Sequence, residues 1–156
     1  MTRYAAGTDV DVGRSREELE RIVVRYGASA FGYGWEDGTA VVQFKASGRF
    51  VKFTLPMPDP GDRVFTHTPE RGHARSEAAA VKAWEQAVKQ RWRALALVVK
   101  AKLEAVESGI TSFDEEFLAH LLLPDGSTVG ETAIPGVALA YERGGMPRLL
   151  PETASA

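Results

Sequence analysis

Two periods of hydrophobic residues divide the first part of the chain. Ser15 and Glu18 have the spacing of a capping box, and the apolar residues after them recur at helical intervals until Gly27. Apolar and polar residues then alternate with the period of a strand in three runs separated by Asp-Gly and Ser-Gly turns, and these runs span 31–35, 40–44 and 51–55. The pattern predicts a helix followed by a three-stranded antiparallel meander.

The most regular helical pattern begins near Ser76 and ends at Gly109. Its apolar residues advance in steps of three or four, which places them within about 100° of one another on one side of a helix. They are Trp84, Val88, Trp92, Leu95, Val99, Leu103 and Val106. A sheet with one apolar face and a helix with one apolar stripe cover each other. We therefore expect the long helix to pack on the sheet, with both of its tryptophans in the core.

Shorter elements are predicted elsewhere. Residues 63–68, after a proline-rich loop, are expected to form a short fourth strand or an ordered extension. Ser112 and Glu115 have capping-box spacing and begin a short helix. A small hairpin is expected around the Asp-Gly pair at 125–126, and a last helix is expected from Pro135 toward Tyr141, ending at the glycine pair that follows.

The predicted fold class is α+β: a helix, a three-stranded antiparallel meander, a long amphipathic helix packed on the sheet, then a short helix, a small hairpin and a C-terminal helix. The 156 residues correspond to one domain, expected over 15–148. Residues 1–14 are predicted to form a flexible N-terminal arm, and residues 149–156 a disordered tail.

Composition narrows the possible chemistry. The chain contains no cysteine, which excludes a thiol nucleophile, a Cys-based zinc site and an iron–sulfur cluster. We find no nucleophile elbow, no Gly-rich phosphate loop and no paired-carboxylate signature, so the chain is not expected to be an enzyme and no cofactor is predicted. No apolar run approaches the ~20 residues that span a bilayer, and the first residues lack the apolar stretch of a signal peptide. We therefore expect a cytoplasmic protein.

Charge is distributed unevenly along the chain. The formal net charge is −2, but residues 1–103 carry 17 basic and 12 acidic side chains, whereas residues 104–156 carry 2 basic and 9 acidic side chains. Within the first part, residues 63–102 hold 9 basic and 3 acidic side chains. This basic stretch is a candidate surface for a polyanion, and the alternative is a solvated helix face.

Four cations of the long helix, Lys82, Lys89, Arg93 and Lys100, fall within about 40° of one another at 100° per residue, and about 100° away from the apolar stripe. Arg75 continues their line if the helix begins early enough. Such a row can follow a phosphate backbone and predicts salt-dependent binding that tolerates any base sequence. The alternative is that these long side chains only keep the helix soluble.

The loop before the long helix is the second candidate for phosphate binding. It combines hydroxyls, imidazoles and guanidiniums around Pro69 and Gly72, and the side chains suited to phosphate are Thr66, His67, Thr68, Arg71, His73 and Arg75. A metal site from His67 and His73, with Asp62 or Glu70 as a third ligand, matches no standard ligand spacing. We therefore predict no metal.

The first predicted strand carries Phe31, Tyr33 and Trp35 on one face. These rings could stack on unpaired bases, or they could belong to the core under a helix. The opposite strand face is a second polar candidate if it is exposed; we assign to it Ser29, Gly32, Gly34, Gln43, Lys45, Arg49 and Lys52.

The order of elements over 15–108 resembles that of the double-stranded-RNA-binding domain and, more loosely, the core of ring-forming single-strand annealing proteins. The first of these families places a lysine-rich motif at the start of its second helix, whereas here the cations are scattered. Its function is therefore not carried over.

A broader resemblance covers residues 15–151. It rests on Phe65-Thr66-His67-Thr68-Pro69, Trp84-Glu85-Gln86-Ala87, Gln90-Arg91-Trp92-Arg93-Ala94-Leu95, residues 100–107 and Leu123-Pro124-Asp125-Gly126. These motifs are similar to those of a family of small uncharacterised proteins of tailed phages and prophages. The resemblance implies a role in the cytoplasm of an infected bacterium and supplies no catalytic residues.

Two functions from different classes follow. The first is a phage accessory protein that binds DNA or RNA through Arg71, Arg75, Lys82, Lys89, Arg93 and Lys100, in replication or recombination. The alternative is a protein-binding inhibitor of a host defence or nucleic-acid-handling system, for which a sheet edge or the apolar tail supplies the interface. A homo-oligomer is compatible with either function. An enzyme is a third possibility, for which the loop with His67 and His73 is the sole candidate site.

Overall fold

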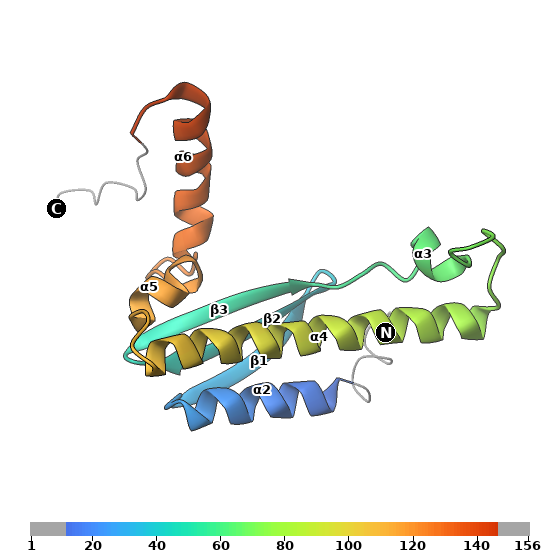
Figure 1. Cartoon of the computed structure of the whole chain (residues 1–156), viewed down its shortest axis with the longest axis horizontal. Helices are drawn as coiled ribbons and strands as arrows, with labels where there is room; N and C mark the ends of the chain where they lie inside the picture. Colours follow the sequence, from blue (N-terminus) through green and yellow to red (C-terminus); the bar gives the residue numbers. More distant parts are fainter. Residues whose placement is uncertain (1–11, 147–156) are drawn as a thin grey trace.

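The structure is a computed structural model, and it describes residues 12–146 (Figure 1). The chain has the predicted α+β fold. Its elements are α2 (Gly13–Arg25), β1 (Ala30–Glu36), β2 (Thr39–Ala46), β3 (Arg49–Pro56), α3 (Arg63–Thr66), α4 (Glu77–Glu107), α5 (Phe113–Phe117), the 3-10 helix η1 (Leu118–His120) and α6 (Val129–Arg143).

The three strands form an antiparallel meander in the order β1-β2-β3, as predicted. Two-residue turns set the register, because both residues of each turn have positive φ: Asp37 and Gly38 at 45° and 74°, Ser47 and Gly48 at 51° and 71°. Such turns match the right-handed twist of the strands that they connect. As a result, Phe44 lies opposite Phe31 on one side and Val51 on the other.

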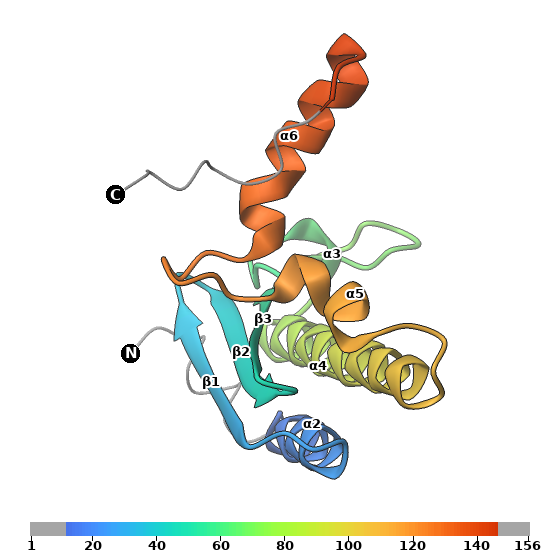
Figure 2. The same cartoon turned by 90° about the vertical axis from the view of Figure 1, so that its left-hand side faces the viewer.

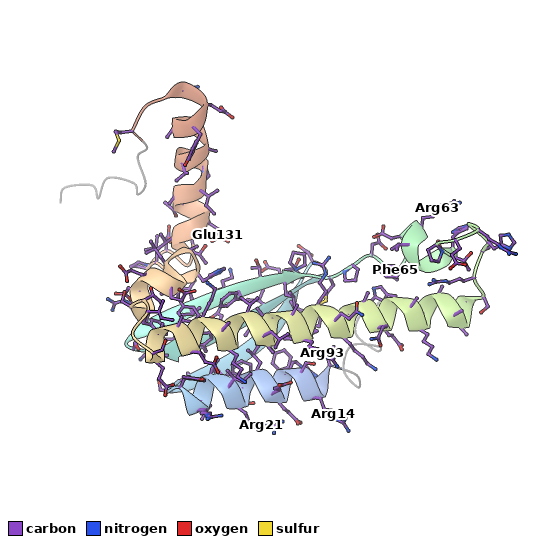
Figure 3. The ribbon with its side chains drawn as sticks, in the orientation of Figure 1. Arg14, Arg21, Arg63, Phe65, Arg93 and Glu131 are labelled. Carbon is purple, nitrogen blue, oxygen red and sulfur yellow. The ribbon has the colours of Figure 1, made fainter. Side chains whose placement is uncertain are left out.

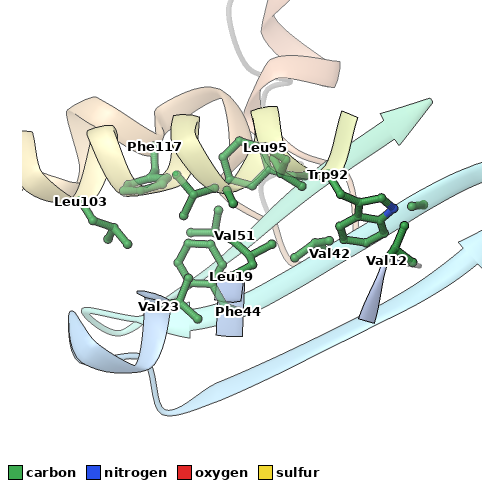
Figure 4. Close-up of a cluster of buried hydrophobic side chains, with 14 of the residues drawn as sticks. Val12, Leu19, Val23, Val42, Phe44, Val51, Trp92, Leu95, Leu103 and Phe117 are labelled. Carbon is green, nitrogen blue, oxygen red and sulfur yellow. The ribbon is translucent and has the colours of Figure 1, made fainter. Parts of the chain in front are cut away.

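Helices α2 and α4 lie next to each other on one face of this sheet (Figures 1 and 2). The apolar stripe predicted for the long helix is buried from Trp84 to Leu103, and Trp92 is fully buried. It packs against the alternate residues of β2 and β3, including Val42, Phe44 and Val51 (Figure 4). The prediction that both tryptophans of α4 belong to the core is confirmed.

The first turns of α4 extend beyond the sheet, where the preceding loop covers them. The indole Nε1 of Trp84 donates a hydrogen bond of 2.7 Å to the carbonyl of Pro58. Phe65 of α3 is buried in the same core. Residues 63–66 form a short helix, so the prediction of a fourth strand is wrong. Extended pairing is limited to one bridge, between His67 and Ala74.

The start of the first helix also differs from the prediction. Helix α2 begins at Gly13 with Val12 as its N-cap, and no side chain caps it. Val12 is buried in the core, which continues the apolar stripe one turn upstream of the Ser15 and Glu18 pattern. Residues 12–14 thus belong to the fold, whereas the rest of the predicted arm, 1–11, and the predicted tail, 149–156, lie outside the described residues.

The C-terminal elements follow the predicted order. Ser112 and Glu115 form the expected capping box at α5. The small hairpin is reduced to a tight turn with one bridge, between Leu122 and Thr128.

The last helix starts earlier than the sequence pattern indicated. Helix α6 begins at Val129 instead of Pro135, because Thr128 and Glu131 make a second capping box, and Pro135 lies inside the helix. The helix ends at Gly144 (φ 68°), as predicted.

Helix α6 rises away from the sheet, and only its first turn packs against η1 (Figures 1 and 2). Gly130 is buried at this contact. The position requires glycine, because a Cβ on it would lie 2.8 Å from the carbonyl oxygen of Ala119. Over residues 12–146, no helix is both long and apolar enough to cross a membrane.

Candidate nucleic-acid interface

The basic face of α4 consists of Lys82, Lys89, Arg93 and Lys100. Lys82, Arg93 and Lys100 are exposed, and Lys89 is half-buried. At 1.5 Å per residue, the row is about 27 Å long. The buried stripe lies on another side of the same helix and fixes its rotation about its axis, which places the four predicted cations on one side of α4.

Three of the four cations of this face have no acidic partner among the described residues. Within residues 12–146, no carboxylate lies within 4.0 Å of Lys82, Arg93 or Lys100. The segment 82–102 contains six basic side chains and one acidic side chain, Glu85. An excess of positive charge on a solvated helix surface raises the local concentration of polyanions.

Two other cations of α4 have structural contacts instead. Arg91 donates from Nη1 to the carbonyl of Pro56 at 3.2 Å. Lys102 donates from Nζ to a carboxylate oxygen of Glu116 at 3.0 Å and to its carbonyl at 3.2 Å, which ties α4 to α5. Both residues fall on the side of the helix away from the basic face, so helix geometry separates binding candidates from structural cations.

The loop before α4 holds itself together with the groups that were predicted to bind phosphate. The Thr66 hydroxyl donates to the carbonyl of Asp62 and shares a contact of 2.8 Å with Nδ1 of His67. The Thr68 hydroxyl accepts the backbone N–H of His73 at 3.1 Å. Arg75 donates from Nη1 to the carbonyl of Phe65 at 3.2 Å. These hydroxyl and guanidinium groups already have hydrogen-bond partners within the chain, and holding the loop together is a sufficient role for them.

The predicted merger of loop and helix cations into one track does not occur. In Figure 3, Arg93 lies on the edge of α4 that faces α2, whereas Arg63 and Phe65 lie on the opposite side of α4. Arg75 is turned toward Phe65 and does not continue the basic face. Arg71 is exposed at the tip of the loop, beside the turn at Gly72. The candidate interface is therefore the basic face of α4 without the loop.

Helix α2 adds cations that the sequence analysis missed. Arg14, Arg21 and Arg25 are exposed and are spaced by seven and four residues, which places them on one side of α2. Helix α2 packs beside α4, but Figure 3 shows Arg14 and Arg21 on the side of α2 turned away from α4, so they do not adjoin the basic face. The same helical spacing test, applied to residues 13–25, would have found this group.

The aromatic residues of β1 face the helices. The guanidinium of Arg16 lies 4.2 Å from the ring centroid of Tyr33, and Trp35 meets Trp92 edge-on at 6.4 Å. Phe31 packs against the core. The interpretation as core accounts for these contacts, although Tyr33 and Trp35 remain 49% and 40% exposed at the edge of the sheet, beyond which no strand lies among residues 12–146.

The face of the sheet turned away from the helices carries Gln43, Lys45 and Lys52. An open hollow of about 420 Å³ lies here, with Gly32, Gly34 and Val41 among its lining residues. The assignment of Arg49 to this face is wrong, because Arg49 pairs with buried Ala46 across the strands and makes two 3.1 Å hydrogen bonds to the carboxylate of Asp114. The ring of exposed Phe50 lies 5.2 Å from Lys45 Nζ.

The histidines do not form a metal centre. Within the described residues, no three potential ligands cluster. His120 stacks on Phe53 with centroids 4.0 Å apart. Burial, and to a lesser extent the charge of Lys102, holds the pKa of His120 below its ordinary value, while a hydrogen bond with the backbone of Lys52 acts in the opposite direction.

The fold and this surface were also compared with known proteins. The chain matches no family model, no curated protein and no solved structure. The candidate interface therefore rests on its own geometry.

Proposed function

We propose that this protein binds the phosphate backbone of DNA or RNA through the basic face of α4. The observation that carries this proposal is that Lys82, Arg93 and Lys100, three exposed cations with no ion pair among residues 12–146, share one side of about 27 Å of rigid helix. Lysine and arginine side chains placed in this way neutralise phosphates and release counterions. Contacts to phosphate carry no sequence information, so the binding is expected to be independent of base sequence.

The resemblance to small proteins of tailed phages supplies the biological setting of the proposal. In an infected bacterium, a protein that binds nucleic acid without sequence preference would serve as an accessory factor in phage replication or recombination.

Salt dependence of binding tests this proposal. Affinity for a fluorescent oligonucleotide of random sequence, single-stranded and duplex, is measured by anisotropy between about 50 and 200 mM salt. We expect the logarithm of the association constant to fall linearly with the logarithm of salt concentration. The variant R93Q/K100Q should flatten the slope by about 1.8 for a duplex, since each lost phosphate contact contributes about 0.9.

A matched variant separates this surface from net charge. R63Q/R71Q also removes two cations, but from the other side of α4 and from the loop. It should leave the slope nearly unchanged. Both double variants should keep the wild-type free energy of unfolding within about 0.5 kcal/mol, because all four side chains are exposed. Equal slopes for the two variants, or no binding at 50 mM salt, would exclude the basic face as the interface.

Helix α6 favours a second candidate function, the binding of a host protein as an inhibitor. Ile134, Leu139 and Tyr141 are 62%, 46% and 89% exposed, although a helix with so few polar residues is ordinarily covered. Under this alternative, charge removal on α4 leaves the function intact, whereas I134E/Y141E abolishes it. Recovery of a defined host protein with the wild type and its loss with I134E/Y141E would support the alternative.

A further inference from the structure

The two edges of the sheet differ in how their backbone groups are used. At the β3 edge, the segment after η1 pairs with the strand: Leu122 donates its N–H to the carbonyl of Phe50 at 2.9 Å, and Leu121 bridges Val51. His120 hydrogen-bonds the backbone of Lys52 at the same edge. At the β1 edge, no described segment pairs with the strand, which is outermost in the sheet (Figure 2).

The register identifies the backbone groups that β1 leaves open. The turn at Asp37 and Gly38 makes Glu36 and Thr39 a hydrogen-bonded pair, and such pairs recur at every second residue toward Ala30. The even-numbered residues of β1 therefore bond β2. The N–H and C=O groups of Phe31, Tyr33 and Trp35 point outward from the sheet.

The sequence of this edge lacks the devices that usually protect an edge strand. Natural edges carry charged residues, prolines or bulges that block pairing with a further strand. Residues 31–35 read Phe-Gly-Tyr-Gly-Trp and contain neither a charge nor a proline. Tyr33 and Trp35 are partly uncovered at the same place. An unprotected edge with exposed aromatic rings is typical of a site for strand addition.

We infer that β1 pairs with β1 of a second copy of this chain, antiparallel and centred on Tyr33. The sequence is self-complementary about that residue. A two-fold axis places Tyr33 opposite Tyr33, and Phe31 opposite Trp35, of the other copy. Each of these pairs exchanges two backbone hydrogen bonds through the groups that point outward. The result is one continuous six-stranded sheet with a closed, isologous interface.

The side chains fit this pairing on both faces of the sheet. On the helix side, aromatic rings meet aromatic rings across the axis, and the exposed parts of Tyr33 and Trp35 become covered. On the other side, Gly32 lies opposite Gly34 of the second copy.

Charges at the ends of the paired strands are complementary. Glu36 of the second copy falls opposite Ala30, whose neighbour in β2 is Lys45. The small Ala30 side chain leaves room for the lysine, once it leaves the ring of Phe50 on β3, to reach the glutamate across two strand spacings of about 4.8 Å each. The two-fold axis produces this contact twice.

Oligomeric state and charge pairing test the inference. The full-length wild type is measured by light scattering over a concentration series, and its mass should rise from 16.9 kDa toward twice that value. The variant G32K/G34K should stay monomeric, because its lysines face each other across the axis. A Cβ at either glycine meets nothing within 4 Å in the single chain, so this variant keeps its fold. Mixing G32K/G34K with G32E/G34E should restore a dimer.

Two further measurements fix the edge and the register. Thr54 of β3 is exposed on the same face of the sheet as Gly34, but at the other edge. The variant T54K should therefore dimerise like the wild type. The chain has no natural cysteine, so a mixture of G32C and G34C chains should form a disulfide that neither variant forms alone. A wild type that stays monomeric at millimolar concentration, a dimer that survives G32K/G34K, or equal crosslinking in all three samples would overturn the inference.

Discussion

Two sides of α4 differ in burial and in charge: the apolar stripe lies in the core, and the basic face lies toward solvent. On the side of the apolar stripe, Trp92 is fully buried, and Val88, one turn before it, and Val99, two turns after it, are nearly so. On the basic side, Lys82, Arg93 and Lys100 are exposed and have no carboxylate partner among residues 12–146. Burial of apolar area stabilises the fold and fixes the rotation of the helix. That rotation then presents cations to solvent at a fixed spacing, at little cost in stability. Substitutions can therefore test the apolar stripe, which stabilises the fold, separately from the basic face, which is proposed to bind nucleic acid.

Substitution on the stripe side should have the largest effect on stability. Trp92→Ala removes a fully buried indole from the contact with Trp35 and from the centre of the core. We expect the free energy of unfolding to fall by about 3–5 kcal/mol in urea denaturation. The neighbouring variant Arg93→Ala, on the basic side, should change it by less than about 0.5 kcal/mol. A loss below about 1 kcal/mol for Trp92→Ala would contradict the stated position of the core.

The junction between α4 and α5 should give an intermediate effect. Lys102 and Glu116 are about one-quarter exposed and their charged atoms are 3.0 Å apart. Lys102→Ala leaves the Glu116 carboxylate partly desolvated without its partner, and should cost about 1–2 kcal/mol in the same assay. Lys100→Ala, two residues away on the basic face, is the matched control and should be neutral. A double-mutant cycle with Glu116→Ala measures the pair itself, and a coupling energy near zero would contradict this role.

The pH dependence of stability should show the smallest effect. The pKa of His120 lies below 6.5 in the folded chain because burial and Lys102 disfavour its charged form. The unfolded chain therefore takes up a proton first as the pH falls, so the free energy of unfolding should decrease below about pH 6.5 and be constant above it. His120→Gln should remove this part of the slope between pH 7.5 and pH 5.5. Lys102→Ala should reduce it, because one cause of the lowered pKa is gone.

Part of the fold could be predicted because local rules decide it. The Asp-Gly and Ser-Gly turns impose positive φ at both of their residues, which sets the register of the meander. The spacing of Trp84, Val88 and Trp92 predicts the buried stripe of α4, since a helix presents residues three and four apart on one side. The glycine after α6 marks its end for a similar reason, because Gly144 adopts a left-handed conformation there.

Errors arose where tertiary contacts outweighed local signals. The pattern at Ser15 and Glu18 predicts a cap, yet burial of Val12 extends α2 upstream. Pro135 is a typical first residue of a helix, yet the capping box of Thr128 and Glu131 starts α6 a turn and a half earlier. In each case a neighbour in space or a stronger cap moved the boundary.

The basic row of α4 was predictable in full, because a regular helix converts sequence spacing directly into position on a surface. The loop cations were not, because an irregular segment has no fixed period and its direction depends on what it packs against. Arg75 turns toward the carbonyl of Phe65 because α3 folds back over the start of α4. Within the part of the chain that the structure describes, β1 likewise has no further partner, since the segment 120–122 reaches β3 and not β1. Sequence alone determined the periodic elements and the charges that they carry, and the tertiary structure decided which charges share a surface and which backbone groups remain unpaired, since both depend on contacts between segments far apart in the chain.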